Sequence, residues 1–468
     1  MNNNNTQCRA FRNHIWDDYR YDIHSHTATA TYYVCINYKN GTCPGRGVKK
    51  NDEFEVTTAH NHRPNRGELK ERLFKQNLYV NVSTRDGNYR QIYDEVRLSH
   101  PEGARNWPFA RCENTMYKWR QKNSPQPVNC FSDYVNVINS NEWKHLKDYD
   151  TGSLNVSLAT TNDLSKSIVI VDPEFVQHLG INGFVFLDGT FKSVPCLING
   201  LQLITLITIR YNHAIPFAWI LMERKTTQAY VAAFEKLRNL LPGFRISEAM
   251  IDFEAALRNA LRLVFPGVII YGCHFHYCQA LYRKAIKLGF KVFLRQNNEA
   301  KFLLRQLMAL AFLPSNEIIA TFHEIVDSLP PRIRQKMKEF LKYYKKEWLQ
   351  KVTPDLFCVY QLIRRTNNVL ESYNRTLQQK IGIHPQIWKF TRNLVHLQQS
   401  LRYDFVSLQR GHRVSRVKKV HDRKKEELLR IAWDKLSKEN RPTSFEFLNE
   451  VIAICINPVL EYFNTFHV

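Results

Sequence analysis

Two aspartates each stand where a run of residues that reads as a strand ends, a position at which a carboxylate can do chemistry. Asp188 follows the apolar run Phe184–Leu187 and precedes Gly-Thr, and Asp252 ends a second strand-like run at residues 246–251. A buried carboxylate is costly unless it is paired or binds a metal, and α/β proteins place chemistry at strand ends. If the runs are neighbouring parallel strands, Mg²⁺ or Mn²⁺ between the carboxylates would relieve their repulsion. The alternative is that each Asp opens a tight turn.

A two-metal site needs a third carboxylate, and Glu371 is the best candidate. It lies in the stretch RRTNNVLESYNRTL, whose apolar residues recur at helical spacing. Thr366 or Asn367 could cap this helix. Because Glu is common in helices, a solvated surface position remains the alternative.

Four potential zinc ligands lie among short segments rich in aromatic and β-branched residues. They are Cys35, Cys43, His60 and His62. Small β units with little core often fold around zinc held by two thiolates and two imidazoles. In an extended segment alternate side chains share a face, so the two histidines could close one site. The alternative is a pair of buried cysteines beside a polar loop.

The carboxylates must be positioned by an ordered set of elements that begins at Phe184. The pattern predicts three strands, a helix, a strand, a helix and a strand, at residues 184–191, 201–209, 215–222, 228–241, 246–251, 254–264 and 268–272. This is the order of a ribonuclease-H-like domain. Residues 281–360 are strongly helical in pattern, and Trp348 within them could stack on an unpaired base or lie in the core.

The composition favours a partner that is an anionic polymer. The chain has 468 residues, is 44% hydrophobic and carries a formal net charge of +23. Lys and Arg contacts to phosphate supply most non-specific affinity for nucleic acids. No secretory signal or membrane span is expected, because the most apolar stretch, residues 201–222, is broken by polar residues. The ten cysteines are scattered, which favours reduced thiols and metal ligands over disulfides.

Residues 16–64 resemble a FLYWCH-type zinc finger. The shared features are the aromatic strand Tyr32-Tyr33-Val34-Cys35, the second thiol at Cys43 and the terminal His60-Asn61-His62. The resemblance implies a Zn²⁺ site of these cysteines and histidines and a role in recognising DNA ends.

Residues 182–280 resemble the core of a Mutator-like (MULE) transposase domain. The landmarks are Asp188-Gly189-Thr190-Phe191, Ile251-Asp252-Phe253-Glu254, Phe265-Pro266 and Cys273-x-x-His276, followed by Asn367-Asn368-x-x-Glu371. The resemblance implies a catalytic triad of Asp188, Asp252 and Glu371 that holds two Mg²⁺ or Mn²⁺ ions. Cys273 and His276 map onto a family motif, but a buried, hydrogen-bonded pair without metal stays equally open.

The expected fold is therefore α+β and multidomain. We expect a zinc-binding β module (1–65), a mainly helical segment for DNA binding or dimerisation (66–175), a ribonuclease-H-like α/β catalytic core (176–280), a helical insertion (281–360), a return helix with the third carboxylate (361–400) and a helical basic C-terminal segment (401–468). The basic run of this last segment could contact phosphate, direct the chain to the nucleus or be a solvated helix face; its cations are Arg413, Arg416, Lys418, Lys419, Arg423, Lys424 and Lys425.

The expected function is that of a DNA transposase that cleaves phosphodiesters and transfers strands at transposon ends. Its partner would be double-stranded DNA, with no membrane, and a homodimer stays open. The alternative is a domesticated transposase that regulates by sequence-specific DNA binding without catalysis. Loss of cleavage with retained binding in an Asp188→Ala variant would separate the enzyme from the regulator.

Overall fold

The computed structural model describes residues 13–85, 87–196, 198–414 and 420–465. The chain divides into two compact units, residues 1–127 and 128–468, which we describe separately. Among the described residues, no helix combines the length and apolar character that a membrane span requires.

The first unit begins with a five-stranded antiparallel sheet in the order of the chain. Its strands are β1 (His14–Trp16), β2 (Tyr19–His26), β3 (Ala30–Cys35), β4 (Arg46–Lys50) and β5 (Glu53–Thr58). Asp17-Asp18 and Asn51-Asp52 form two-residue turns with positive φ at both positions, which matches the twist of the strands they join.

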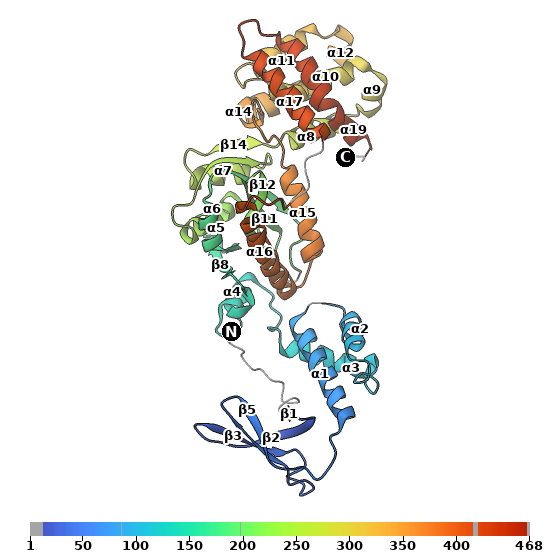
Figure 1. The fold of residues 1–468 in the computed structure, drawn as a ribbon. Helices are drawn as coiled ribbons and strands as arrows, with labels where there is room; N and C mark the ends of the chain where they lie inside the picture. The colour runs from blue at the N-terminus through green and yellow to red at the C-terminus, as the bar shows by residue number, and fades with distance from the viewer. Residues whose placement is uncertain (1–12, 86, 197, 415–419, 466–468) are drawn as a thin grey trace. The chain divides into compact units, whose positions relative to one another are not determined.

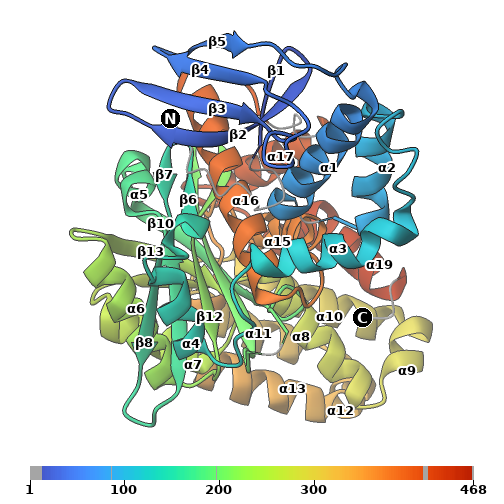
Figure 2. The same ribbon diagram turned by 90° about the horizontal axis from the view of Figure 1, so that it is seen from below.

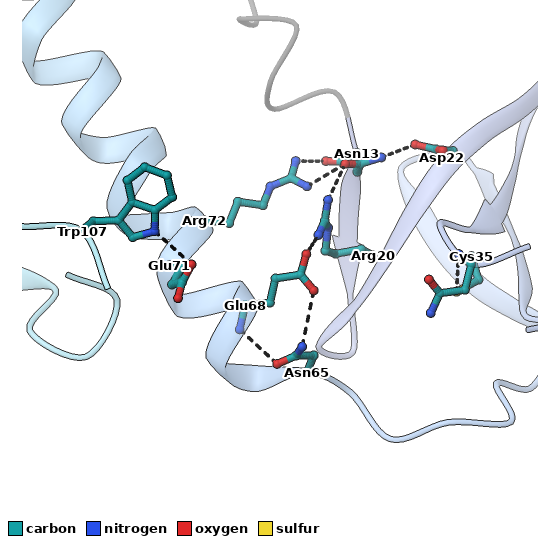
Figure 3. Close-up of polar contacts among 10 residues, drawn as sticks. Asn13, Arg20, Asp22, Cys35, Asn65, Glu68, Glu71, Arg72 and Trp107 are labelled. Atoms are coloured by element: carbon teal, nitrogen blue, oxygen red, sulfur yellow. Dashed lines mark hydrogen bonds and ion pairs between the residues drawn. The ribbon is translucent and has the colours of Figure 1, made fainter. Parts of the chain in front are cut away.

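Three helices complete the first unit: α1 (Arg66–Thr84), α2 (Tyr89–Ser99) and α3 (Phe109–Lys122). They pack around a core that includes Phe74, Tyr93 and Met116. A polar network joins the sheet to α1 (Figure 3): Arg20 forms an ion pair with Glu68, and the Arg72 guanidinium donates to Asn13. These contacts make the β module and the helices one unit.

The second unit is built on a seven-stranded sheet in the order β14-β13-β10-β11-β12-β9-β8. Its strands are β8 (Asn155–Thr160), β9 (Lys166–Val171), β10 (Asn182–Thr190), β11 (Gln202–Arg210), β12 (His213–Met222), β13 (Arg245–Ile251) and β14 (Ile269–Gly272). The central strands β10, β11 and β12 are antiparallel, whereas β13 runs parallel to β10 and β14 parallel to β13.

Strands β8 and β9 lie within residues 66–175, which we expected to be mainly helical and in which no strand was predicted. Both strands pair antiparallel at the β12 edge of the sheet. The segment KSIVIV is apolar and β-branched and is almost wholly buried, as expected for a strand inside a sheet. Residues 66–175 also include α4 (Phe131–Asn139) and the start of α5 (Pro173–Leu179). The helices before residue 128 belong to the first unit, whereas α4, α5 and the two strands belong to the second.

Helices cover both faces of the sheet (Figures 1 and 2). On one face α5, α6 (Thr227–Leu240) and α7 (Ala255–Val264) pack against the strands. On the other face lie α4, α15 (Asn368–Ile381) and α16 (Ile387–Gln409). Helix α16 continues across residue 401, where the sequence analysis placed a domain boundary.

The remaining helices form a second core beyond β14, at the top of Figure 1. They are α8 (His274–Lys287), α9 (Lys291–Gln296), α10 (Asn298–Ala309), α11 (Ile318–Ser328), α12 (Pro331–Lys336), α13 (Lys338–Tyr344), the π-helix η4 (Lys345–Val352), α14 (Pro354–Phe357), α17 (Val420–Leu436), α18 (Ser444–Val451), the π-helix η5 (Ile452–Ile456) and α19 (Asn457–Thr465). Residues before and after α15 and α16 therefore share one core. Trp348 lies in it, only 2% exposed, so it is a core residue.

Candidate active site and candidate metal centre

Two cysteines and two histidines come together in the first unit. The ligand atoms of Cys35, Cys43, His60 and His62 all lie within 4.8 Å of one another. Cys35 Sγ is 3.4 Å from His62 Nε2, and Cys43 Sγ is 3.3 Å from His60 Nδ1. Cys35 ends β3, and the histidines follow β5, so adjacent hairpins bring the four side chains together.

Hydrogen bonds outside the cluster fix the orientation of each ligand. Nε2 of His60 lies 2.7 Å from the Tyr21 hydroxyl, to which it would donate when Nδ1 binds a metal. Nδ1 of His62 donates to the carbonyl oxygen of Arg63 at 2.9 Å. Such partners set the imidazole tautomer that leaves the other nitrogen free for a metal. Burial lowers the pKa of His60, which favours the neutral imidazole that binds metal.

The donor set fits Zn²⁺. Two thiolates and two imidazoles are a common tetrahedral set for structural zinc. Both sulfurs also accept backbone N–H groups, Cys35 from Asn37 and Cys43 from Gly45, each at 3.4 Å. These bonds stabilise thiolates. Gly45 is also packed against His60, because a Cβ on it would lie 2.6 Å from Nδ1 of that ring.

In the second unit, parallel strands bring Asp188 and Asp252 to one edge of the sheet. Phe186 on β10 pairs in register with Met250 on β13, and each Asp stands two residues further on. Parallel neighbours end at the same edge of a sheet, so the two carboxylates are adjacent. Gly189 directly follows Asp188, and a Cβ there would meet the Gln202 side chain at 2.8 Å.

Asp188 is held by its own loop and by helix α15. Its Oδ1 accepts the Gly189 N–H at 2.8 Å, and its Oδ2 accepts Nδ2 of Asn374 at 3.3 Å. The pKa of Asp188 is raised to about 7, mainly by burial and also by the charges of Asp252 and Glu371, whereas His276 and the Gly189 N–H oppose the rise. Such repulsion is relieved when a cation binds between carboxylates.

Asp252 is contacted by the Cys-x-x-His element and by the start of α15. Nδ1 of His276 lies 2.6 Å from Oδ1 of Asp252, and Nδ2 of Asn367 lies 3.4 Å from the same oxygen. Burial alone would lower the pKa of His276, but Asp252 and Cys273 raise it to about 11. His276 and Asp252 thus lie within ion-pair distance of each other.

Cys273 and His276 tie the second strand end to the helix of the third carboxylate. The thiol of Cys273 accepts the Asn367 N–H at 3.2 Å, while His276 reaches Asp252. Within the described residues, neither belongs to a group of three or more metal-ligating side chains within 4.8 Å. Cys273 is fully buried, whereas the His276 side chain is 25% exposed.

Glu371 stands in the first turn of α15, and this helix is anchored on the sheet. Leu370 packs with Phe186 and Met250, and the Trp219 indole N–H donates to the Tyr373 hydroxyl at 2.9 Å. Among the described residues, only one group of three or more metal-ligating side chains has its ligand atoms within 4.8 Å of one another, namely Cys35, Cys43, His60 and His62 (the zinc-type cluster). Asp252 and Glu371 thus raise the pKa of Asp188, but the oxygens of the three carboxylates do not all lie within 4.8 Å of one another.

Two side-chain contacts of this site were not predicted from the sequence: that of Asn367 with Asp252 and that of Asn374 with Asp188. The amide of Asn367, proposed as a helix cap, goes to Asp252 instead and makes no side-chain capping bond. Asn374 lies three residues after Glu371 and seven after Asn367, so the three share one face of α15. That spacing was the available signal.

The basic C-terminal run is only partly described. Arg413, Arg423 and Lys424 are exposed, and Lys425 is partly buried. Arg416, Lys418 and Lys419 lie outside the described residues. The run precedes and enters α17.

The comparison with protein families finds a match over the strands that position the two aspartates. Residues 184–280 match the family model described as MULE transposase domain. The matched segment runs from β10 into α8 and includes both Asp188 and Asp252, whereas Glu371 and the zinc-type cluster lie outside it. No curated protein matches the chain. The match supports a transposase of the MULE type and implies DNA as the partner.

Proposed function

We propose that the protein is a Mutator-like transposase of the DDE type, which cleaves DNA at transposon ends and transfers the strands. The observation that carries this proposal is the pair Asp188 and Asp252, side by side at the ends of parallel strands inside the segment that matches the MULE transposase domain. The sheet supports a ribonuclease-H-like core, because three antiparallel strands are followed by two parallel ones. Helix α15 carries Glu371 beside them.

Asp188, Asp252 and Glu371 would hold the catalytic Mg²⁺ or Mn²⁺ ions. Carboxylate oxygens suit these hard cations, and both burial and the neighbouring carboxylates raise the pKa of Asp188. When bound, two such ions activate the attacking water or 3′-hydroxyl and stabilise the leaving oxygen. Asn374 would hold the Asp188 carboxylate in place, and His276 that of Asp252.

The first unit would recognise DNA. We propose that Cys35, Cys43, His60 and His62 bind Zn²⁺ and that the module is of the FLYWCH type. The net charge of +23 would hold the phosphate backbone of double-stranded DNA, because cationic side chains release condensed counterions. Work on such DNA would place the protein in the nucleus, and a homodimer would bind two ends together.

A cleavage assay tests this function. The zinc-loaded full chain is mixed with labelled duplex that carries the ends of its own element, with and without Mg²⁺. Asp188→Asn should lower the cleavage rate by about a hundredfold or more while DNA affinity is kept. Asp434→Asn, a change of the same kind at an exposed site on α17, should leave the rate unchanged. No Mg²⁺-dependent cleavage by the parent chain would sink the proposal and leave a DNA-binding regulator.

A further inference from the structure

A cavity of about 490 Å³ opens at the N-terminal end of α15, among α8, α17 and η5. We call it the α15 pocket. Its size lies in the range of small-molecule sites, roughly 300–1,000 Å³. Its walls combine aromatic rings, aliphatic side chains, cations, short polar groups and the two carboxylates of Asp422 and Glu426.

The aromatic wall comes from Phe275 and Phe312. Phe312 is almost fully buried and packs edge-on against His274, with ring centroids 4.7 Å apart. Ile363 lines the same pocket and is 81% exposed. An aliphatic side chain so open to water beside aromatic rings is suited to cover a flat, apolar ligand face.

The cations are Arg364, Arg365 and Lys425. Arg365 is already paired with Glu426 at 3.1 Å. In the described part of the chain, no carboxylate lies within ion-pair distance of Arg364 or Lys425. The N-terminus of the 14-residue helix α15 also lies at the pocket, and the positive end of a helix dipole favours an anion. Two cations and a helix terminus are thus available to a phosphate.

The polar lining places the pocket next to the carboxylates. Thr366 and Asn368 line it, and Asn367 between them contacts Asp252. Ser372, also in the lining, directly follows Glu371. A strand held at the carboxylates can therefore reach the pocket with its neighbouring nucleotide.

We propose that the α15 pocket takes one unpaired nucleotide of the DNA strand, swung out of the duplex beside the bond that is cut. Phe275 and Ile363 would cover the faces of the base, Arg364 and Lys425 would hold its phosphate, and Thr366 and Ser372 would contact its polar edge. A base pair is too large and too stiff for this space, so only an extruded nucleotide can enter. The inference rests on the proposed function, because it assumes a DNA substrate at the carboxylates.

The test compares two duplexes that differ by one nucleotide. The probes are a fluorescein-labelled 20-base-pair DNA and the same DNA with a single bulged adenosine, titrated with the zinc-loaded full chain without Mg²⁺ or Mn²⁺. Stacking on aromatic side chains should make the bulged duplex bind about tenfold more tightly. Lys425→Ala and the pocket-filling Ser372→Trp should each abolish this preference. Lys438→Ala, at an exposed lysine outside the lining, should keep it.

Equal affinity of the parent chain for both duplexes would overturn the inference. A preference that survives both Ser372→Trp and Lys425→Ala would also overturn it, because the nucleotide would then bind elsewhere. An unchanged melting temperature for each variant shows that the protein is folded. Failure here is distinct from failure of the proposed function. A preference without Mg²⁺-dependent cleavage leaves the pocket and removes the transposase, whereas cleavage without a preference removes the pocket alone.

Discussion

Replacing Gly45 by Ala should weaken zinc binding strongly, because the space for a methyl group is taken by a ligand. The new Cβ would lie 2.6 Å from Nδ1 and 2.7 Å from Cε1 of His60, while ordinary contact starts at 3.4 Å. The ring must therefore retreat by about 0.8 Å, the difference between these distances. Metal–ligand distances tolerate only about 0.2 Å, so His60 should leave the metal. We expect zinc affinity to fall by roughly 100-fold, or about 2.7 kcal/mol.

The assay is competition for zinc between the full chain and a chelating dye. Gly67→Ala is the matched control, because it makes the same change in α1 with its nearest neighbour, Asn65 Oδ1, at 3.6 Å. The control should bind zinc as the parent does, and its helix should be slightly more stable. Equal zinc affinity for Gly45→Ala and the parent would refute the assignment of His60 as a ligand.

Three further changes test other parts of the account. His276→Ala removes the partner of Asp252 and should lower the cleavage rate by about 10–100-fold without changing DNA affinity; an unchanged rate would show that His276 does not position Asp252. The pKa of Asp188 is raised to about 7 in the folded protein, so the folded state holds this proton more tightly than the unfolded chain does. The free energy of unfolding is therefore highest below about pH 4 and falls as the pH rises to about 7. Without Mg²⁺, denaturant titrations should therefore show a steeper fall across this window for the parent than for Asp188→Asn, and parallel curves would contradict the shift. Trp348→Ala opens a cavity in the helical core and should cost about 3–5 kcal/mol of unfolding free energy, while DNA affinity of the folded variant is kept; selective loss of binding to unpaired bases would instead restore a stacking role.

The strands around the aspartates could be predicted because local pattern decides them. The apolar runs just before the two aspartates, Val185–Leu187 on β10 and Ala249–Ile251 on β13, are fully buried, which is typical of central parallel strands. Asp188 and Asp252 then follow from where those runs end. Strands β8 and β9 were missed because a short apolar segment next to helices is ambiguous without its partner strand. Their pairing with β12 is a long-range contact.

The contacts made by side chains at the site depend on the packing of distant segments. Asn374 lies 186 residues from Asp188, so its spacing places it on the face of Glu371 but does not show that its amide reaches that carboxylate. The shared helical core has the same origin, since Trp433 on α17 donates its indole N–H to the Phe312 carbonyl at 3.0 Å. The zinc-type cluster was easier to predict from the sequence, because its four ligands fall within 28 residues and their types alone suggest the ion.

The central claim is that Asp188, Asp252 and Glu371 hold a pair of divalent ions, and a crystal structure with Mn²⁺ tests it most directly. The account predicts two anomalous peaks about 3.5–4 Å apart, with Asp188 touching both and Glu371 drawn inward from α15. An Asp188→Asn crystal grown the same way should lack at least one peak. Peaks absent from the parent protein, or a single ion that Glu371 does not reach, would contradict the account.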